Sequence, residues 1–169
     1  VSQVKYVIPT HVHLDHAGGA GAMMKVFTEA ELVIHPAGAK HMIDPSRLIL
    51  STIEVYGESA FKKLYGEIPP IDKDRVIEAQ HEQIIKLGSR ELLMIHTPGH
   101  AYHHLCVVDS TSKGIFSGDT FGLSYPDILN QNKRFILPTT TPTQFDPAAL
   151  HDSIDLIMSH QPKRIFLTH

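Results

Sequence analysis

The sequence has very little cysteine, no strong net charge and no long apolar run. Cys106 is the only cysteine among 169 residues, so no internal disulfide can form and we expect a reducing, cytoplasmic location. The formal net charge of -3 gives no reason to expect nucleic acid or an anionic membrane as a partner. No segment approaches the roughly 18 apolar residues of a membrane span, so we expect neither a transmembrane segment nor a signal peptide.

What is present is the composition of an ordinary globular domain. A hydrophobic fraction of 42% with 20% charged residues is too apolar for a disordered chain. The length suits one domain with a sizeable core, and we take 1–169 as that domain. Because the chain opens on Val1 and stops on His169 directly after a strand-like run, we expect the domain to be truncated at both ends.

Periodicity and turn signals predict strands mixed with helices. Helices are expected over 19–27, from Asp44 to about Gly66 with a break at Gly57, and after Asp146. The expected strands cover 4–8, 31–34, 83–87, 91–96, 103–109, 114–116 and 163–167. The run of hairpins in the middle predicts an α/β fold whose sheet is largely antiparallel or mixed, because parallel strands need crossover helices.

The segment THVHLDHAGG, residues 10–19, carries the most information. His11, His13, Asp15 and His16 place four potential metal ligands within six residues, more than a solvated loop or a packed core requires. In extended backbone His11 and His13 point to the same side, and Asp15 follows in that alternation. Imidazole and carboxylate are ligands that zinc accepts in catalytic sites, so we predict a metal site here.

Three later positions repeat one pattern, in which an apolar strand ends on a ligand-type residue. His100 follows 92–95 in TPGH, Asp119 follows 115–116 in SGD, and His169 follows 165–167. Strand ends are rigid and gather at one edge of a sheet, so these side chains can converge without ordering a long loop. Together with the first cluster they predict one metal centre.

The succession THVHLDHAGG, TPGHAYHH, SGDTFG and a terminal TH resembles the metallo-β-lactamase superfamily over essentially all of the chain. It is most similar to the glyoxalase II and lactonase-like side, and to a poorly characterised branch with TPGHAxHH. The resemblance implies an αββα sandwich, present here as an incomplete portion, with the metals at one edge between two sheets.

The resemblance also implies the ligand set. The first metal would take His11, His13 and His100. The second would take Asp15, His16 and His169, with Asp119 bridging the two ions. The implied cofactors are two zinc ions, with iron or manganese as alternatives.

Two such cations bring the pKa of a bound water to about 7 and so supply hydroxide at neutral pH. We therefore expect an enzyme, a dinuclear zinc hydrolase acting on a small ester, thioester or lactone. Asp15 is the expected catalytic residue, since its carboxylate can orient the nucleophile or carry a proton. The partner is a small-molecule substrate, with a homodimer left open.

The sequence is also compatible with three other functions. Hydrolysis of phosphodiesters is a second function within the family, although the lack of a basic patch argues against a large nucleic acid. A mononuclear iron oxidoreductase, similar to sulfur dioxygenases, is a third. A non-catalytic metal-binding domain is the reading that the full ligand set disfavours most.

Several residues are weighed and set aside. Cys106 in a strand-like run is expected to be buried and inert. His103 or His104 could support a metal ligand, and Tyr125 could reach a substrate. Lys133 and Arg134 could meet an anionic group, although a solvated basic pair is the simpler account. The remaining histidines are expected to be structural or exposed: His35, His41, His81, His96, His151 and His160.

Overall fold

The chain forms two compact units, Val1–Ala79 and Gln80–His169, each with its own sheet and buried core. The structure is a computed structural model that describes residues 3–125, 135–139 and 144–169. Lys133 and Arg134 therefore lie outside the described residues. No helix within the described ranges combines the length and low charge needed to cross a membrane.

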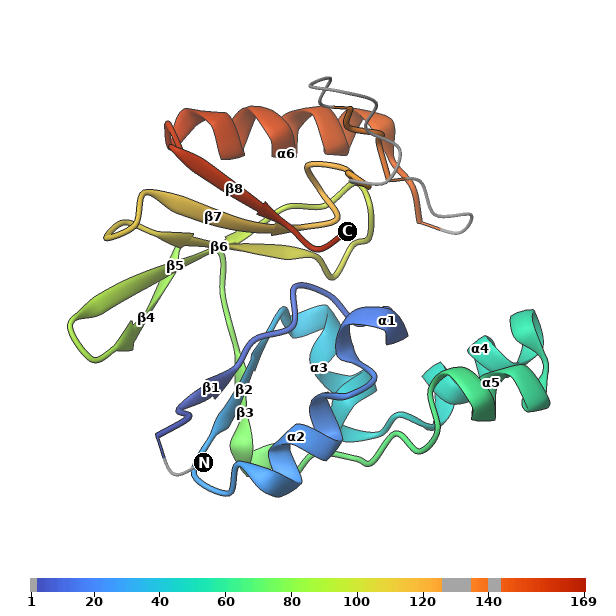
Figure 1. Ribbon diagram of the computed structural model, residues 1–169. Helices are drawn as coiled ribbons and strands as arrows, with labels where there is room; N and C mark the ends of the chain where they lie inside the picture. The colour runs from blue at the N-terminus through green and yellow to red at the C-terminus, as the bar shows by residue number, and fades with distance from the viewer. Residues whose placement is uncertain (1–2, 126–134, 140–143) are drawn as a thin grey trace. The chain divides into compact units, whose positions relative to one another are not determined.

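The first unit is built on a parallel three-stranded sheet (Figure 1). Its strands are β1 (Tyr6–Val7), β2 (Glu31–Ile34) and β3 (Val76–Glu78). The connections contain α1 (Leu14–Ala17), α2 (Ala20–Val26), α3 (Pro36–Ile43), α4 (Ser46–Tyr56), α5 (Glu58–Leu64) and the 3-10 helix η1 (Lys73–Arg75). These helices supply the crossovers that parallel pairing requires. The expected antiparallel or mixed pairing is wrong for this unit, because α3 and β3 were not recognised in the sequence.

Helix α2 packs on this sheet through one face. Ala20, Gly21 and Met24 are buried, whereas Met23 and Val26 are exposed by 46% and 57%. A side chain at Gly21 would place its Cβ 2.1 Å from the backbone oxygen of Pro69, so close backbone approach selects this face.

A single arginine closes the end of α2. The guanidinium of Arg75 donates to the backbone oxygens of Met24, Phe27 and Ala30. These are among the carbonyls that a helix end and the following turn leave without a helical partner. Arg75 thus ties η1, which precedes β3, to the segment that leads into β2.

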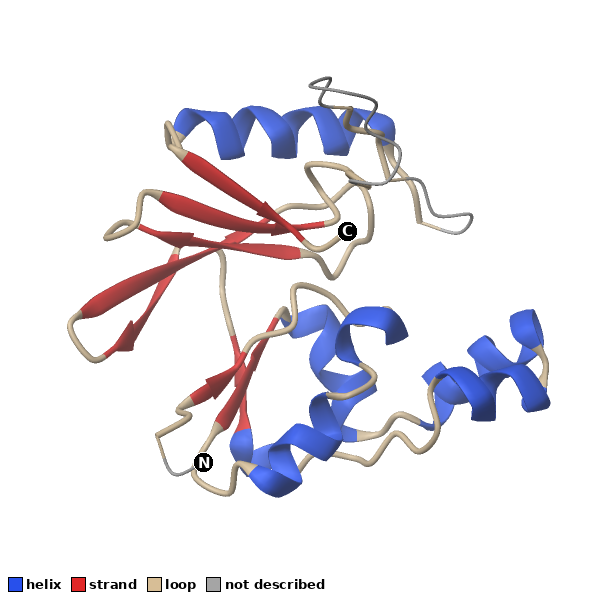
Figure 2. Ribbon diagram, in the orientation of Figure 1, coloured by secondary structure: helices blue, strands red, loops and turns tan. Residues whose placement is uncertain are grey.

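The break predicted at Gly57 is confirmed. Gly57 has φ 80°, a left-handed conformation that glycine adopts without a steric penalty, and it separates α4 from α5 (Figure 2). At the start of α4 the Asp44 carboxylate accepts from the amide and hydroxyl of Ser46. These hydrogen bonds hold the pKa of Asp44 below its ordinary value.

The second unit is a five-stranded mixed sheet in the order β4-β5-β6-β7-β8. Its strands are β4 (Gln83–Leu87), β5 (Arg90–His96), β6 (Leu105–Asp109), β7 (Gly114–Gly118) and β8 (Arg164–Leu167). All neighbours are antiparallel except β7 and β8, so the hairpin prediction is confirmed here. As a result, the carboxyl ends of β5, β7 and β8 share one edge with the start of β6.

Helix α6 (Pro147–Ser159) covers part of one face of this sheet. It begins as predicted, because the Asp146 carboxylate accepts from the amides of Ala148 and Ala149. Ile157 packs in a core with Ile95 and Cys106. Cys106 is fully buried, as expected, and burial raises the pKa of its thiol to about 12.

Candidate metal centre

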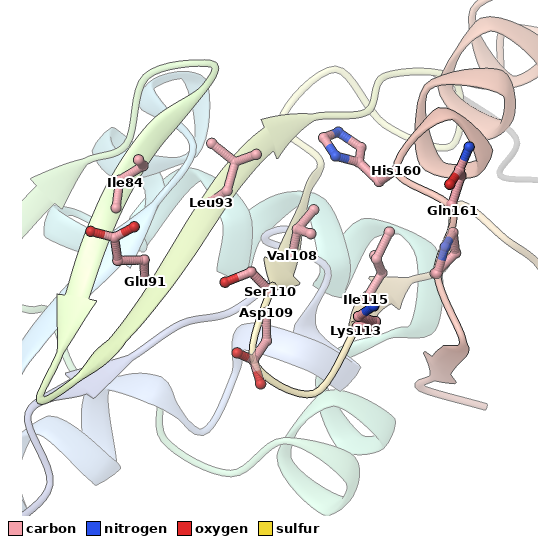
Figure 3. Close-up of a pocket in the computed structure, with 11 residues that line it drawn as sticks. Ile84, Glu91, Leu93, Val108, Asp109, Ser110, Lys113, Ile115, His160 and Gln161 are labelled. Carbon is pink, nitrogen blue, oxygen red and sulfur yellow. The ribbon is translucent and has the colours of Figure 1, made fainter.

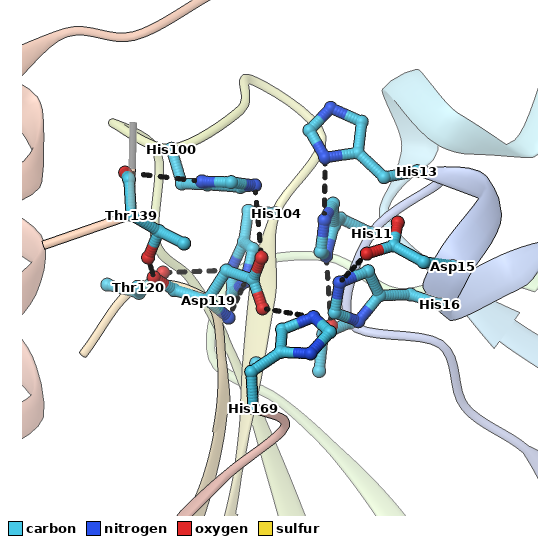
Figure 4. Close-up of polar contacts among 12 residues, drawn as sticks. His11, His13, Asp15, His16, His100, His104, Asp119, Thr120, Thr139 and His169 are labelled. Carbon is cyan, nitrogen blue, oxygen red and sulfur yellow. Dashed lines mark hydrogen bonds and ion pairs between the residues drawn. The ribbon is translucent and has the colours of Figure 1, made fainter. Parts of the chain in front are cut away.

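The four ligand-type residues of the first unit lie where β1 leads into α1 (Figure 4). The Nε2 atom of His11 is 2.9 Å from Nδ1 of His13, and the rings of His11 and His16 lie 4.1 Å apart between centres. Oδ2 of Asp15 is 3.4 Å from Nε2 of His16. The fold thus gathers three imidazoles and a carboxylate within one short segment.

The backbone of this segment differs from the extended alternation that was expected. His13 is extended, with φ -61° and ψ 142°, but its carbonyl accepts from the amide of Ala17 at 2.8 Å. Residues 14–17 therefore close a helical turn, and Asp15 lies on α1 instead of continuing the strand alternation. This part of the prediction is wrong, because a helical turn rotates each residue by about 100° relative to the previous one.

The three later residues gather at one edge of the second unit's sheet. Asp119 follows β7 and stands between two imidazoles: its Oδ2 atom is 3.5 Å from Nε2 of His100 and its Oδ1 atom 3.8 Å from Nε2 of His169 (Figure 4). Asp119 and His100 are buried, with 4% and 2% of their surface exposed. The predicted convergence of strand ends is confirmed within this unit, while the ligand roles remain predictions.

Thr139 supports two members of this group, and the sequence had not singled it out. Its hydroxyl donates to the backbone oxygen of Asp119, and its own backbone oxygen lies 3.4 Å from Nδ1 of His100. Thr139 comes from the long segment after β7, where the only sequence signal was its position before the last helix.

Helix α6 approaches the backbone at position 99 so closely that only glycine fits there. Gly99 has φ 126°, and a Cβ atom at this position would lie 2.4 Å from backbone atoms of Leu150 on α6. The amide of Asp146 also donates to the Gly99 carbonyl at 2.8 Å. The start of α6 therefore fixes the backbone directly before His100.

Some of the residues set aside have structural partners. His35 accepts from the amide of Ala37 at the start of α3, and His81 accepts from the amide of His96. His151 and His160 are exposed on or just after α6, and Tyr125 is 47% exposed. His104 is fully buried and hydrogen-bonded around Asp119. The four histidines at positions 35, 81, 151 and 160 are structural or exposed, as expected. His104 differs from them because it is buried beside Asp119.

A cavity of about 430 Å³ lies elsewhere in the second unit (Figure 3). Its walls include Asp109 at the end of β6, Lys113 in the turn between β6 and β7, and Gln161 just after α6. That turn is at the opposite end of β7 from Asp119. None of the predicted ligands lines the cavity, so it is separate from the group around Asp119.

The fold and the ligand-type residues define a class of protein. The chain belongs to the metallo-beta-lactamase superfamily, whose family model matches residues 1–169. The sequence motifs had predicted this superfamily and its fold, and the prediction is confirmed.

Among known proteins, the chain is 26% identical over 173 residues to the metallo-beta-lactamase fold-containing protein ST1585 of Sulfurisphaera tokodaii, covering 100% of this chain and 61% of the relative. The crystal structure of ST1585 from Sulfolobus tokodaii is described as that of an archaeal metallo-beta-lactamase superfamily protein. It matches this chain with a TM-score of 0.83 at 26% sequence identity, and the match covers 100% of this chain and 62% of the ST1585 chain. The chain therefore has the metallo-beta-lactamase fold and spans about six tenths of this relative's length.

Two further relatives are described as a thioesterase and a hydrolase. The acyl-coenzyme A thioesterase MBLAC2 of Gallus gallus is 32% identical over 118 residues, covering 66% of this chain and 40% of the relative. The hydroxyacylglutathione hydrolase of a Polaromonas species is 29% identical over 120 residues, covering 70% of this chain and 34% of the relative.

Proposed function

We propose that this chain is the metal-binding part of a hydrolase that cleaves a small thioester with the help of two divalent cations. The observation that carries the proposal is Asp119, a buried carboxylate with one oxygen toward His100 and the other toward His169. One carboxylate placed in this way can offer an oxygen to each of two ions. Membership of the superfamily supports the reaction class, as do the relatives described as an acyl-coenzyme A thioesterase and a hydroxyacylglutathione hydrolase.

The separations in the second unit fit chelation. Two ligands that bind one zinc tetrahedrally at about 2.1 Å each lie about 3.4 Å from one another. The 3.5 Å between His100 and Asp119 is close to that value and longer than an ordinary hydrogen bond. His11 and His13, at 2.9 Å, stand at hydrogen-bond distance, where a cation would replace the shared proton.

The proposed ligand sets follow the family order. His11, His13 and His100 would hold the first ion, Asp15, His16 and His169 the second, and Asp119 would bridge them. Bound divalent cations supply a hydroxide nucleophile at neutral pH and stabilise the oxyanion that develops on the substrate carbonyl. Zinc is the proposed metal, with iron and manganese as the alternatives that analysis must separate.

Within this scheme Asp15 has a role that the other carboxylate cannot take. Its side chain is 53% exposed, whereas that of Asp119 is 6% exposed. An accessible carboxylate held 3.4 Å from the His16 ring can orient water and release a proton to solvent. Asp119, by contrast, is placed to hold its ligands in a fixed arrangement.

The first test is metal content of the protein at its natural length, purified without added metal. We expect about two equivalents of zinc in the wild type and their loss in Asp119→Ala. The control is Asp155→Ala, which removes an exposed carboxylate from α6 and should keep the metal. One iron per chain would favour the oxidoreductase, and absence of metal from the wild type would overturn the proposal.

The substrate class is tested on the metal-loaded protein with an acyl-coenzyme A, an S-acylglutathione, a simple ester, a lactone and an activated phosphodiester. We expect the two thioesters to be cleaved with the highest kcat/KM. Preference for the phosphodiester would replace the proposed reaction. The cytoplasmic location and a homodimer are further proposals, which cell fractionation and light scattering can check.

A further inference from the structure

His104 occupies the point where three strand ends of the second unit meet. It lies just before β6, which separates β5 from β7 in the sheet, and none of its surface is exposed. The ends of β5 and β7 lead to His100 and Asp119. His104 is therefore placed between the two loops that carry these proposed ligands (Figure 4).

The hydrogen bonds of His104 reach both loops. The backbone amide of Asp119 donates to Nε2 of His104 at 3.2 Å. On the other side of the ring, Nδ1 is 2.8 Å from the hydroxyl of Thr97 and 3.0 Å from the hydroxyl of Thr120. Thr97 opens the TPGH loop and Thr120 follows Asp119, so one imidazole joins the two segments.

These contacts determine which ring nitrogen carries the hydrogen. Because an amide can only donate, Nε2 of His104 must accept, and the hydrogen of the neutral ring lies on Nδ1. The Thr120 hydroxyl donates to the backbone oxygen of Thr97 at 3.3 Å, which leaves its lone pairs to accept from Nδ1. The group of hydrogen bonds is thus mutually consistent and lies in the dry interior, where such networks specify one arrangement.

We propose that His104 is a positioning residue for the metal centre: it holds the backbone of Asp119 at a fixed distance from the TPGH loop, and so fixes the bridging carboxylate relative to His100. This inference rests on the proposed function, in which Asp119 is a metal ligand. His104 touches neither metal nor substrate, and it acts through the amide of Asp119.

Two amide substitutions separate the two ends of the ring. In His104→Gln the side-chain oxygen can reach the place of Nε2 and accept from Asp119. In His104→Asn the shorter side chain can replace only the Nδ1 contacts with the threonines. His151→Gln, on the exposed side of α6, is the matched control.

Metal affinity is measured by chelator competition, and the geometry of the centre by the visible spectrum of the cobalt-substituted protein. We expect His104→Asn to bind metal about 10–100-fold more weakly with an altered cobalt spectrum, whereas His104→Gln stays near the wild type. The metal-free Asn and Gln variants should unfold at similar temperatures. A purely structural role predicts that affinity follows the stability of the metal-free protein.

The inference is overturned if His104→Asn keeps the wild-type affinity and cobalt spectrum, or if the Asn and Gln variants lose both equally. In those cases the wild type still binds two metals and the proposed function stands. A wild type that binds no metal overturns the proposed function, and this inference with it.

Discussion

The Nδ1 atom of His100 lies 3.4 Å from the backbone oxygen of Thr139, and this contact determines the tautomer of the ring. A carbonyl can only accept, so Nδ1 carries the hydrogen and the lone pair of Nε2 faces Asp119. Fixing the tautomer through the outer nitrogen is the usual way in which a protein orients an imidazole ligand. The hydroxyl of Thr139 also donates to the backbone oxygen of Asp119, so Thr139 supports both proposed ligands.

The hydroxyl of Thr139 can be tested alone. Thr139→Val keeps the backbone contact to His100 and removes the hydrogen bond to Asp119. We expect metal affinity to fall by about 10-fold or more, because second-layer contacts of this kind tune ligand placement. Chelator competition measures it, with Thr111→Val in an exposed turn as the control. Equal affinities in the two variants would remove Thr139 from the support of the centre.

Gly99→Ala should destabilise the second unit. The new Cβ would stand 2.4 Å from the backbone of Leu150, at a φ of 126° that L-residues rarely adopt. The backbone strain alone costs about 1–3 kcal/mol, and the overlap adds to it. Thermal denaturation followed by circular dichroism measures the loss.

The control for Gly99 is Gly19→Ala. Gly19 has φ -82°, and a Cβ there would meet nothing within 4 Å. Its free energy of unfolding should change by less than about 0.5 kcal/mol. If both substitutions cost the same, the close approach of α6 is not what requires a glycine at position 99.

Arg75→Met should destabilise the first unit. The substitution keeps much of the apolar stem but removes the donors to three backbone oxygens near the end of α2. We expect a loss of about 2 kcal/mol, since the Met24 and Ala30 oxygens would lose this donor and a buried carbonyl without a partner carries a desolvation cost. The Phe27 oxygen keeps the amide of Ala30 as a donor. Urea denaturation of Arg75→Met and of Arg47→Met, an exposed arginine on α4, gives the comparison. A neutral Arg75→Met would show that water replaces the guanidinium.

Cys106 should resist alkylation while the protein is folded. Burial raises the pKa of its thiol to about 12, so at pH 8 the reactive thiolate is nearly absent and shielded from reagent. Iodoacetamide should modify it only in denaturant, as mass spectrometry would reveal. Labelling at the same rate with and without denaturant would contradict the buried position.

The same shift gives a sign for the pH dependence of stability. The thiol ionises at about pH 9 in the unfolded chain and at about 12 in the folded one. The unfolded state therefore binds fewer protons between these values, and this group lowers the free energy of unfolding as the pH rises. Cys106→Ala should lose this part of the alkaline decline.

The sequence by itself predicted the superfamily, the strand ends that carry the proposed ligands and the residues at which several helices and strands begin. These depend on local chemistry: Asp146 before Pro147 starts a helix, and Gly57 interrupts one, whatever surrounds them. The cluster from His11 to His16 was informative for the same reason, because its members are close in sequence. Its backbone was predicted less well, since a single helical turn leaves no apolar period to read.

Only the tertiary structure decided which face of α2 is buried, how the first sheet pairs and which residues support Asp119. Met24 is buried and Met23 exposed because Gly21 must approach Pro69, a contact across a long stretch of chain. Thr139 gave no signal in the sequence, and His104 was only one of two neighbouring histidines that could support a metal ligand. They become specific because the fold brings a loop and a strand start to the same buried edge, where each donor must find an acceptor.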